Sequence, residues 1–518
     1  IVCDYDRIYK AIENKKSIFK SVAVVTAFSV ATRLFAFLFK VFVSRQFGAS
    51  VVGVYQMALS FYFFASAVAL SGLPTVISRK IAEDEKTGGE NVPSLISTAL
   101  VLSLSSVLPI LSVIYPVAFL LPSVFADERV LPLVVIMLPA LLSTSIYNVI
   151  RSWFWGKRSF LAFSFTEMLE EVLRITFTLI FSLGLIAAVT PLKGLAVGFL
   201  VSDIACAVVL FILFLIKKGK FGRIKDVPAV LKPSLPITAM RVFGGVIGAF
   251  TAIVIPVLLI KYGMEKSDAS ATFGRVTGMA MPLLMAPTTL TGALSVVLIP
   301  EIATIKHDDK SAMSARIDGS INFAIIIAAL FTILYIPLGK EITTFVFKDE
   351  FSGVYLSNVA LMLYPLGLNQ ISTSILNSMG LEKKSFFNYA VGAAILMILT
   401  LALPKYVGIY AVAIGGAAGS VVTSFLNLNA LNKKARILDN PKKTALAILL
   451  SFPLVALTCL LKNLLFSKIP PFFAIAISGG IPMILYLAAC VAFRIFDVTR
   501  FYKTTRKKSL KKRDKSKK

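Results

Sequence analysis

Long apolar stretches recur along the whole of this 518-residue chain, separated by short polar segments. The first, residues 21–43, could cross a membrane as a helix, because about 20 residues at ~1.5 Å each span a ~30 Å hydrocarbon core. No connection is long enough to hold a separate folded domain. The pattern predicts an all-α protein with fourteen transmembrane helices, at about 21–43, 52–77, 93–121, 130–150, 160–183, 191–216, 234–260, 270–299, 318–347, 354–379, 385–403, 407–431, 444–466 and 470–493.

The composition fits a polytopic membrane protein and excludes several classes of function. Hydrophobic residues make up 57% of the chain and the mean hydropathy is +0.83, which is too apolar for a soluble protein. The four cysteines show no disulfide or metal-ligand spacing, and there is one histidine, so we expect no metal site. No Gly-Lys-Ser/Thr loop is present for ATP hydrolysis. We therefore expect a transporter, not an enzyme, without a cofactor and driven by Na⁺, H⁺ or the membrane potential.

Positive residues are concentrated in alternate loops, and the net charge is +27. Of the 54 lysines and arginines, 39 fall on the side of the N-terminus and 10 on the opposite side. Cytoplasmic loops are rich in Lys and Arg, so we expect both termini in the cytoplasm and no nucleic-acid partner. The basic tail from Arg494 either anchors the chain on this side or contacts anionic membrane lipids.

An internal repeat relates the two halves of the chain. Residues 143–148 read STSIYN and residues 372–377 read STSILN, while residues 70–72 (LSG) are echoed by residues 290–292 (LTG). The offsets correspond to six spans, so both halves enter the membrane in the same direction, and a pseudo-two-fold axis along the membrane normal relates them. The predicted domains are an N-terminal tail (1–20), an N-lobe of helices one to six (21–216), a cytoplasmic linker (217–233), a C-lobe of helices seven to twelve (234–431), helices thirteen and fourteen (444–493) and a basic tail (494–518).

Four cations fall in predicted spans that should border a site between the two lobes: Arg33, Lys40, Arg241 and Arg275. A cation inside a membrane helix is unfavourable unless it snorkels, pairs or faces a watery cavity. Arg33 lies about 18 Å along the first span, which is too deep to snorkel. We predict that these four cations line a cavity for an anionic substrate. The alternative is snorkelling to the interface or pairing between helices.

Acidic residues gather in the predicted fifth and sixth spans. Glu170 and Glu171 precede Arg174 by four and three residues, so one helix face can neutralise itself. Glu167 and Asp203 are further acidic candidates on these spans. Structural ion pairs are the plainer interpretation. The alternative is that one carboxylate binds H⁺ or Na⁺ and couples it to transport.

Three stretches resemble a known family. Residues 48–83, 152–174 and 272–303 are similar to the stage V sporulation protein B family, in the polysaccharide transporter branch of the multidrug/oligosaccharidyl-lipid/polysaccharide (MOP) exporter superfamily. The resemblance covers about residues 17–431 and implies a V-shaped, MATE-like fold that works by alternating access. Related lipid II flippases carry essential cavity arginines in helices one and eight. Arg33 matches the first, and Arg275 aligns with the second only after a gap before Pro287.

The resemblance implies a flippase for an undecaprenyl-pyrophosphate-linked sugar, either lipid II-like or a polysaccharide precursor. Such a flippase moves its cargo from the inner to the outer leaflet of the bacterial cell membrane for cell-wall, spore-cortex or polysaccharide synthesis. The fork of an arginine suits a pyrophosphate. We expect a monomer that works beside cell-wall synthesis enzymes. The alternative function is a cation-coupled multidrug exporter of the same superfamily, whose cavity should display carboxylates.

Overall fold

The computed structural model describes residues 2–69, 71–120, 125–183, 190–303, 310–433 and 441–495, and these residues form helices and connecting turns with no strand. This confirms the all-α prediction. The chain divides into two compact units, unit 1 (Ile1–Gly274) and unit 2 (Arg275–Lys518). The predicted lobe boundaries and the V shape concern the arrangement of the whole chain and stay predictions. The predicted basic tail lies outside the described residues from residue 496 onward.

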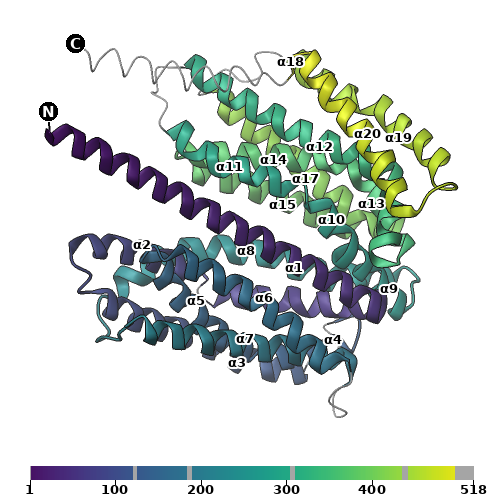
Figure 1. Ribbon diagram of the computed structural model, residues 1–518. Helices are drawn as coiled ribbons and strands as arrows, with labels where there is room; N and C mark the ends of the chain where they lie inside the picture. The colour runs from purple at the N-terminus through teal and green to yellow at the C-terminus, as the bar shows by residue number, and fades with distance from the viewer. Residues whose placement is uncertain are drawn as a thin grey trace. The chain divides into compact units, whose positions relative to one another are not determined.

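In unit 1, helix α5 packs against α2, α3 and α7, while α7 packs along α6 (Figure 1). The buried core between them includes Ile96, Phe154 and Phe214. α1 is kinked at Gly48, where φ is +78°, a value that glycine adopts readily. The elements of unit 1 are α1 (Val2–Val68), α2 (Leu73–Asp84), η1 (Glu85–Thr87), α3 (Val92–Leu120), α4 (Val130–Met137), α5 (Ala140–Gly156), α6 (Phe160–Ser182), α7 (Pro191–Ile216), α8 (Val227–Lys261) and α9 (Lys266–Gly274).

Helix α7 shows why these helices suit a lipid environment. On its inner face, a Cβ added to Gly198 would lie 2.5 Å from the Cα of Thr178, so the backbones of α6 and α7 approach closely. Its outward face carries apolar side chains at helical spacing that are about half exposed, namely Ile204, Val208, Ile212 and Leu215. A continuous exposed apolar face of this kind is stable against lipid and unfavourable in water.

In unit 2, the long helix α12 packs against α13, α14, α19 and α20. Tyr486 donates a hydrogen bond to the carbonyl oxygen of Ala447 at 2.9 Å and ties α20 to α18. The predicted thirteenth and fourteenth helices therefore pack on α12. The elements of unit 2 are η3 (Arg275–Ala280), α10 (Met281–Met285), α11 (Thr288–Ala303), α12 (Lys310–Phe347), α13 (Glu350–Val359), η4 (Ala360–Met362), α14 (Leu363–Ser378), α15 (Glu382–Ala402), α16 (Pro404–Val407), α17 (Tyr410–Asn432), α18 (Pro441–Leu449), α19 (Ser451–Leu465) and α20 (Pro471–Ala492).

Ten helices among the described residues are long and apolar enough to cross a membrane, or eleven if the bent pair α4 and α5 forms one span. The predicted number of fourteen is not confirmed. Three features explain the difference. α1 joins the first two predicted spans across its kink, α6 carries four charged residues, and the predicted eighth span is divided among α9, η3, α10 and α11.

The two units repeat one set of helix contacts. In unit 1, α7 packs against α5 and α6, and in unit 2, α17 packs against α14 and α15. The repeated STSI motifs lie in α5 and α14 and make matching polar contacts. Thr144 donates to Asp203 on α7 at 2.7 Å, and Thr373 accepts from Asn427 on α17 at 3.0 Å. The sequence repeat therefore corresponds to a structural repeat, with an acid at this contact in unit 1 and an amide in unit 2.

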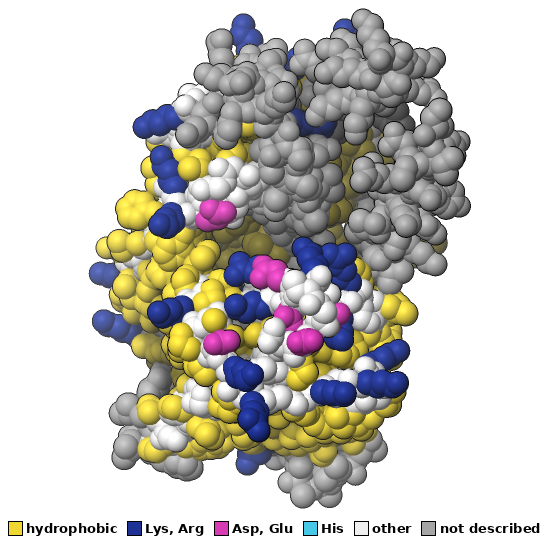
Figure 2. Space-filling view, turned by 90° about the vertical axis from the view of Figure 1, so that its left-hand side faces the viewer, with side chains coloured by type: hydrophobic (Ala, Val, Ile, Leu, Met, Phe, Trp, Pro, Cys, Tyr) yellow, Lys and Arg dark blue, Asp and Glu magenta, His cyan; other side chains and the backbone are white. Residues whose placement is uncertain are grey.

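The loops that follow α2, α5 and α7 meet at one end of unit 1. The backbone N–H of Gly222 donates to the carbonyl of Pro93 at 3.1 Å, and Lys157 pairs with Glu85 at 3.1 Å. Figure 2 looks onto this end and shows many Lys and Arg side chains. The exposed basic residues of these loops include Lys86, Lys157, Arg158, Lys217, Lys218, Lys220, Arg223 and Lys225. The loops of unit 1 that are rich in Lys and Arg therefore lie together at one end of the unit. The assignment of this end to the cytoplasm stays a prediction.

Candidate functional site

Three of the four predicted cavity cations lie in unit 1. Arg33 on α1 is exposed and makes no hydrogen bond or ion pair with any described residue. Lys40, on the same helix, is half-buried, and its charge interacts with that of Glu171. Arg241 on α8 is exposed and donates to the carbonyl oxygen of Ser71 and, at 3.1 Å, to the hydroxyl of Thr75. These three cations therefore have different surroundings, and Arg33 is the least compensated.

The fourth cation, Arg275, lies in unit 2 at the start of η3. Its Nε donates to Asp349 at 2.9 Å, and its guanidinium lies over the ring of Phe351, 4.9 Å from the centroid. Asp349 also caps α13 by accepting the N–H of Ser352 at 2.7 Å. Local contacts thus compensate the charge of Arg275, and its role in substrate binding stays a prediction.

A buried ion-pair network surrounds Arg174 on α6. Its guanidinium lies 2.7 Å from Glu170, 3.1 Å from Glu171 and 3.6 Å from Asp203 on α7. The ring of Phe199 lies 5.1 Å from the guanidinium carbon. The side chains of Arg174 and Asp203 are 19% and 8% exposed. These charges are therefore stabilised mainly by one another and only weakly by hydration.

The remaining acid of the predicted group, Glu167, lies apart from this network. It pairs with Arg151 on α5 at 3.1 Å, and the guanidinium of Arg151 lies 4.0 Å from the centre of the Phe163 ring. The predicted acids therefore form two groups, one at Arg174 and one at Arg151. A role of any of them in ion coupling stays a prediction.

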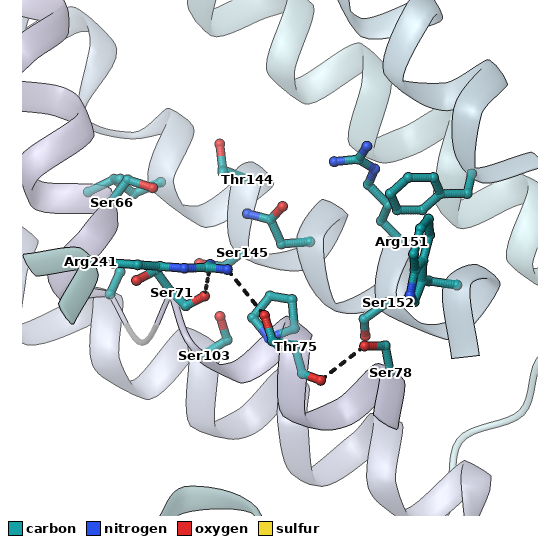
Figure 3. Close-up of a pocket in the computed structure, with 16 residues that line it drawn as sticks. Ser66, Ser71, Thr75, Ser78, Ser103, Thr144, Ser145, Arg151, Ser152 and Arg241 are labelled. Atoms are coloured by element: carbon teal, nitrogen blue, oxygen red, sulfur yellow. Dashed lines mark hydrogen bonds between the residues drawn. The ribbon is translucent and has the colours of Figure 1, made fainter. Parts of the chain in front are cut away.

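A pocket of about 390 Å³ lies within unit 1, between parts of α1, α2, α3, α5, α6 and α8. Figure 3 shows Arg241 and Arg151 reaching into it from opposite sides, with serine and threonine hydroxyls between them. The lining residues are Ser66, Ala69, Ser71, Pro74, Thr75, Ser78, Ser103, Leu141, Thr144, Ser145, Asn148, Arg151, Ser152, Trp155, Phe163 and Arg241. The pocket therefore combines two guanidinium groups with a hydroxyl-rich wall.

Glycines allow the helices around this pocket to approach closely. The N–H of Gly72 donates to the hydroxyl of Thr238 at 3.0 Å, and a Cβ on Gly72 would lie 2.8 Å from the backbone nitrogen of Thr238. This contact brings α8 against the start of α2 and places Arg241, three residues further along α8, beside Ser71. A Cβ on Gly156 would lie 2.7 Å from Ile81, so α5 and α2 are equally close.

Sequence reasoning missed Arg151 and Trp155 as members of a site. Their partners lie on other helices, which the spacing along one helix does not reveal. A signal was nevertheless present, because Thr144, Asn148, Arg151 and Trp155 follow one another at intervals of four, three and four residues. Such spacing places all four on one face of a helix.

The ten or eleven helices able to cross a membrane among the described residues define a multi-pass membrane protein. Residues 18–306, more than half of the chain, match the family described as "Polysaccharide biosynthesis protein". The chain belongs to this family.

Two proteins of Bacillus subtilis (strain 168) are similar in sequence. Stage V sporulation protein B is 25% identical over 463 residues, which cover 84% of this chain and 87% of that protein. Sporulation protein YkvU is 23% identical over 306 residues, which cover 55% of this chain and 65% of that protein. The predicted resemblance to stage V sporulation protein B is confirmed.

Solved structures show the same fold. The lipid II flippase MurJ in an inward closed conformation has a TM-score of 0.70 and 14% identity, covering 90% of this chain and 99% of that chain. An inward-facing multidrug resistance MATE family transporter of the MOP superfamily has a TM-score of 0.60 and 17% identity. This match covers 78% of this chain and 96% of that chain. The chain therefore shares the fold of these MOP superfamily structures. Both a flippase and a drug exporter share this fold, so the fold alone does not choose the cargo.

Proposed function

We propose that this protein is an alternating-access flippase that moves an undecaprenyl-pyrophosphate-linked sugar from the inner to the outer leaflet of a bacterial cell membrane. The observation that carries the proposal is Arg33, an exposed guanidinium in an apolar stretch of α1 without a carboxylate partner among the described residues. A cation is retained at such a position when it faces an aqueous path or an anionic cargo.

The physical basis of the proposed transport is charge complementarity. The pyrophosphate must leave water, and arginine offers it a planar fork of donors while the prenyl chain stays in lipid. We assign this role to Arg33, Lys40 and Arg241 of unit 1 and to Arg275 of unit 2. The similarity to stage V sporulation protein B and to a lipid II flippase supports a cell-wall or spore-cortex precursor as the cargo.

The proposed orientation places both termini and the positive end of unit 1 in the cytoplasm. There the cargo would be collected on the side where its headgroup is assembled. Coupling to H⁺ or Na⁺ would use the acids around Arg174, namely Glu170, Glu171 and Asp203, because they form a cluster of carboxylates within the membrane-spanning helices of unit 1.

The same buried acids favour a second candidate, a cation-coupled multidrug exporter. The two candidates separate in an efflux assay with cationic dyes. A flippase leaves dye efflux at the level of the empty vector. Efflux that depends on Asp203 and survives Arg33→Ala would instead support the exporter.

Depletion in a bacterium that depends on this protein tests the proposed cargo. We expect one lipid-linked precursor to accumulate on the cytoplasmic leaflet, as measured by its extraction and by its inaccessibility to an external labelling reagent. Arg33→Glu should insert into the membrane at the normal level but fail to rescue growth, while Arg33→Lys should rescue in part because it keeps the charge. Full rescue by Arg33→Glu would contradict the role of Arg33.

A further inference from the structure

The pocket of unit 1 is lined by two arginines and by no acidic residue among the described residues. Arg151 is paired with Glu167 behind the wall, whereas Arg241 contacts only a carbonyl and a hydroxyl of the described residues. The pocket is therefore positive on the side of Arg241 and suits an anion there.

Three hydroxyls of the wall already donate their protons to other residues. Ser71 donates its proton to Ala67 O at 2.9 Å, and Ser152 donates to Val149 O at 2.6 Å. Thr144 gives its proton to Asp203 at 2.7 Å. Because these protons are already used, the oxygens offer lone pairs to the pocket. A ligand that fits them must carry several O–H or N–H donors, as a sugar does.

The side of the pocket near Arg151 provides an apolar platform. The indole of Trp155 is 40% exposed and lies 4.4 Å from the ring of Phe163, between centroids. A flat aromatic surface beside a guanidinium group that lines the pocket can hold the C–H face of a sugar ring, while the guanidinium donates to one of its oxygens.

We propose that this pocket binds the sugar-pyrophosphate headgroup of the cargo, with Arg241 on the phosphate side and Arg151 and Trp155 on the sugar side. The inference rests on the proposed flippase function and adds a headgroup site inside unit 1. Its volume of about 390 Å³ lies within the range of small-molecule pockets and leaves the prenyl chain outside. The ligand chemistry is a sugar pyrophosphate, either linked to lipid or free as a nucleotide sugar.

Tryptophan fluorescence offers a direct test, because the chain has only two tryptophans. Trp153 is buried at 4% exposure, so Trp153→Phe in the full-length purified protein leaves Trp155 as the reporter. The probes are a short-chain prenyl-pyrophosphoryl N-acetylglucosamine, UDP-N-acetylglucosamine, inorganic pyrophosphate and free N-acetylglucosamine. We expect the prenyl-linked probe to change the emission saturably, and pyrophosphate or free sugar to bind at least about tenfold more weakly.

Variants assign the signal to the pocket. Arg241→Ala should raise the half-saturating concentration about tenfold or more, Arg241→Lys should raise it less, and Lys261→Ala, an exposed cation further along α8, should leave it unchanged. Trp155→Phe in the otherwise unchanged protein should remove the signal. Thermal unfolding of each variant shows that it is folded. No saturable change with either sugar pyrophosphate, or equal binding by folded Arg241→Ala, would overturn the proposal.

Flipping measured on the same preparations separates this site from the overall function. If the protein flips a lipid-linked sugar and folded Arg241→Ala does so at the normal rate with unchanged binding, the pocket proposal is wrong and the flippase stands. If the pocket binds the prenyl-linked probe but no lipid-linked sugar is flipped, the site stands and the flippase is wrong. Tighter binding of UDP-N-acetylglucosamine than of the prenyl-linked probe supports the site and rejects the lipid-linked source.

Discussion

Arg33 and Arg174 are both arginines within apolar helices, but their surroundings are opposite. Arg174 is surrounded by three carboxylates and an aromatic ring, while Arg33 has no described partner. A buried cation with complete compensation holds helices together, because removing it leaves like charges in a low-dielectric interior. An uncompensated one is more consistent with a role in binding. The structure thus separates a stabilising arginine from a candidate binding arginine.

Arg174→Ala should therefore strongly destabilise the protein. It leaves Glu170, Glu171 and Asp203 close together without a cation, and we expect a loss of about 3–5 kcal/mol in the free energy of unfolding. Thermal unfolding in detergent measures this loss. Arg79→Ala is the control, because the pair Arg79–Glu83 is 64% exposed on both sides and should contribute less than about 1 kcal/mol. Equal effects of the two substitutions would contradict the assignment.

Asp127, in the turn before α4, makes stability depend on pH. Burial alone would raise the pKa of Asp127, but hydrogen bonds from Arg129 and Ser270 outweigh it and hold that pKa below its usual value. An unfolded chain takes up this proton near pH 3.9. The stabilisation is therefore complete above that pH and is lost as the pH falls through the native pKa.

Asp127→Asn should lower the free energy of unfolding by about 1–3 kcal/mol at pH 7. The gap in melting temperature between the wild type and this variant should narrow as the pH is lowered below about 4, because the wild type then loses the same charge. Glu128→Gln is the control, since its carboxylate is 84% exposed and contacts only exposed Lys266. A gap that stays constant with pH would show that the charge of Asp127 is not the cause.

At the scale of elements, close glycine contacts join α1 to α9 and α2 to α8. A Cβ on Gly53 would overlap the carbonyl oxygen of Ser270, and Gly274 faces the same contact from α9. Backbone atoms cannot rotate away as a side chain can. These glycines therefore set the distances between the helices that carry the pocket and the polar turn at Asp127.

Gly53→Ala should destabilise unit 1 by about 1–3 kcal/mol, because α1 and α9 must separate to admit the methyl group. Melting temperatures in detergent measure the effect. Gly244→Ala is a matched control, since a Cβ there has no heavy atom within 4 Å and alanine favours a helix. If Gly53→Ala melts at or above the wild-type temperature, the contact does not limit the distance between α1 and α9.

The sequence predicts some elements closely and others poorly, for physical reasons. α7 and α20 agree with predicted spans because each is one apolar run that starts at a proline. The predicted eighth span fails as one helix because the backbone changes to η3 at Arg275, which a hydropathy pattern cannot show. In the site, spacing predicts Glu170 beside Arg174, but it cannot reveal that Arg174 also reaches Asp203 on α7.

At the scale of the whole molecule, the repeated helix contacts in the two units are unequal in charge. The acid Asp203 meets the STSI motif of unit 1, whereas the amide Asn427 meets the motif of unit 2. The pocket with Arg151 and Arg241 likewise belongs to unit 1. We infer that the repeat supplies the scaffold in both units, while unit 1 carries most of the charged residues proposed for headgroup binding and ion coupling.

The central claim is that this protein moves a sugar pyrophosphate lipid across a membrane by means of its uncompensated cations. Reconstitution into liposomes with a fluorescent lipid-linked sugar, read by a membrane-impermeant quencher, tests it most directly. We expect the wild type to expose the cargo faster than protein-free liposomes and Arg33→Ala to be slower than the wild type by at least about tenfold. Exposure no faster than in protein-free liposomes, or an equal rate with folded Arg33→Ala, would contradict the account.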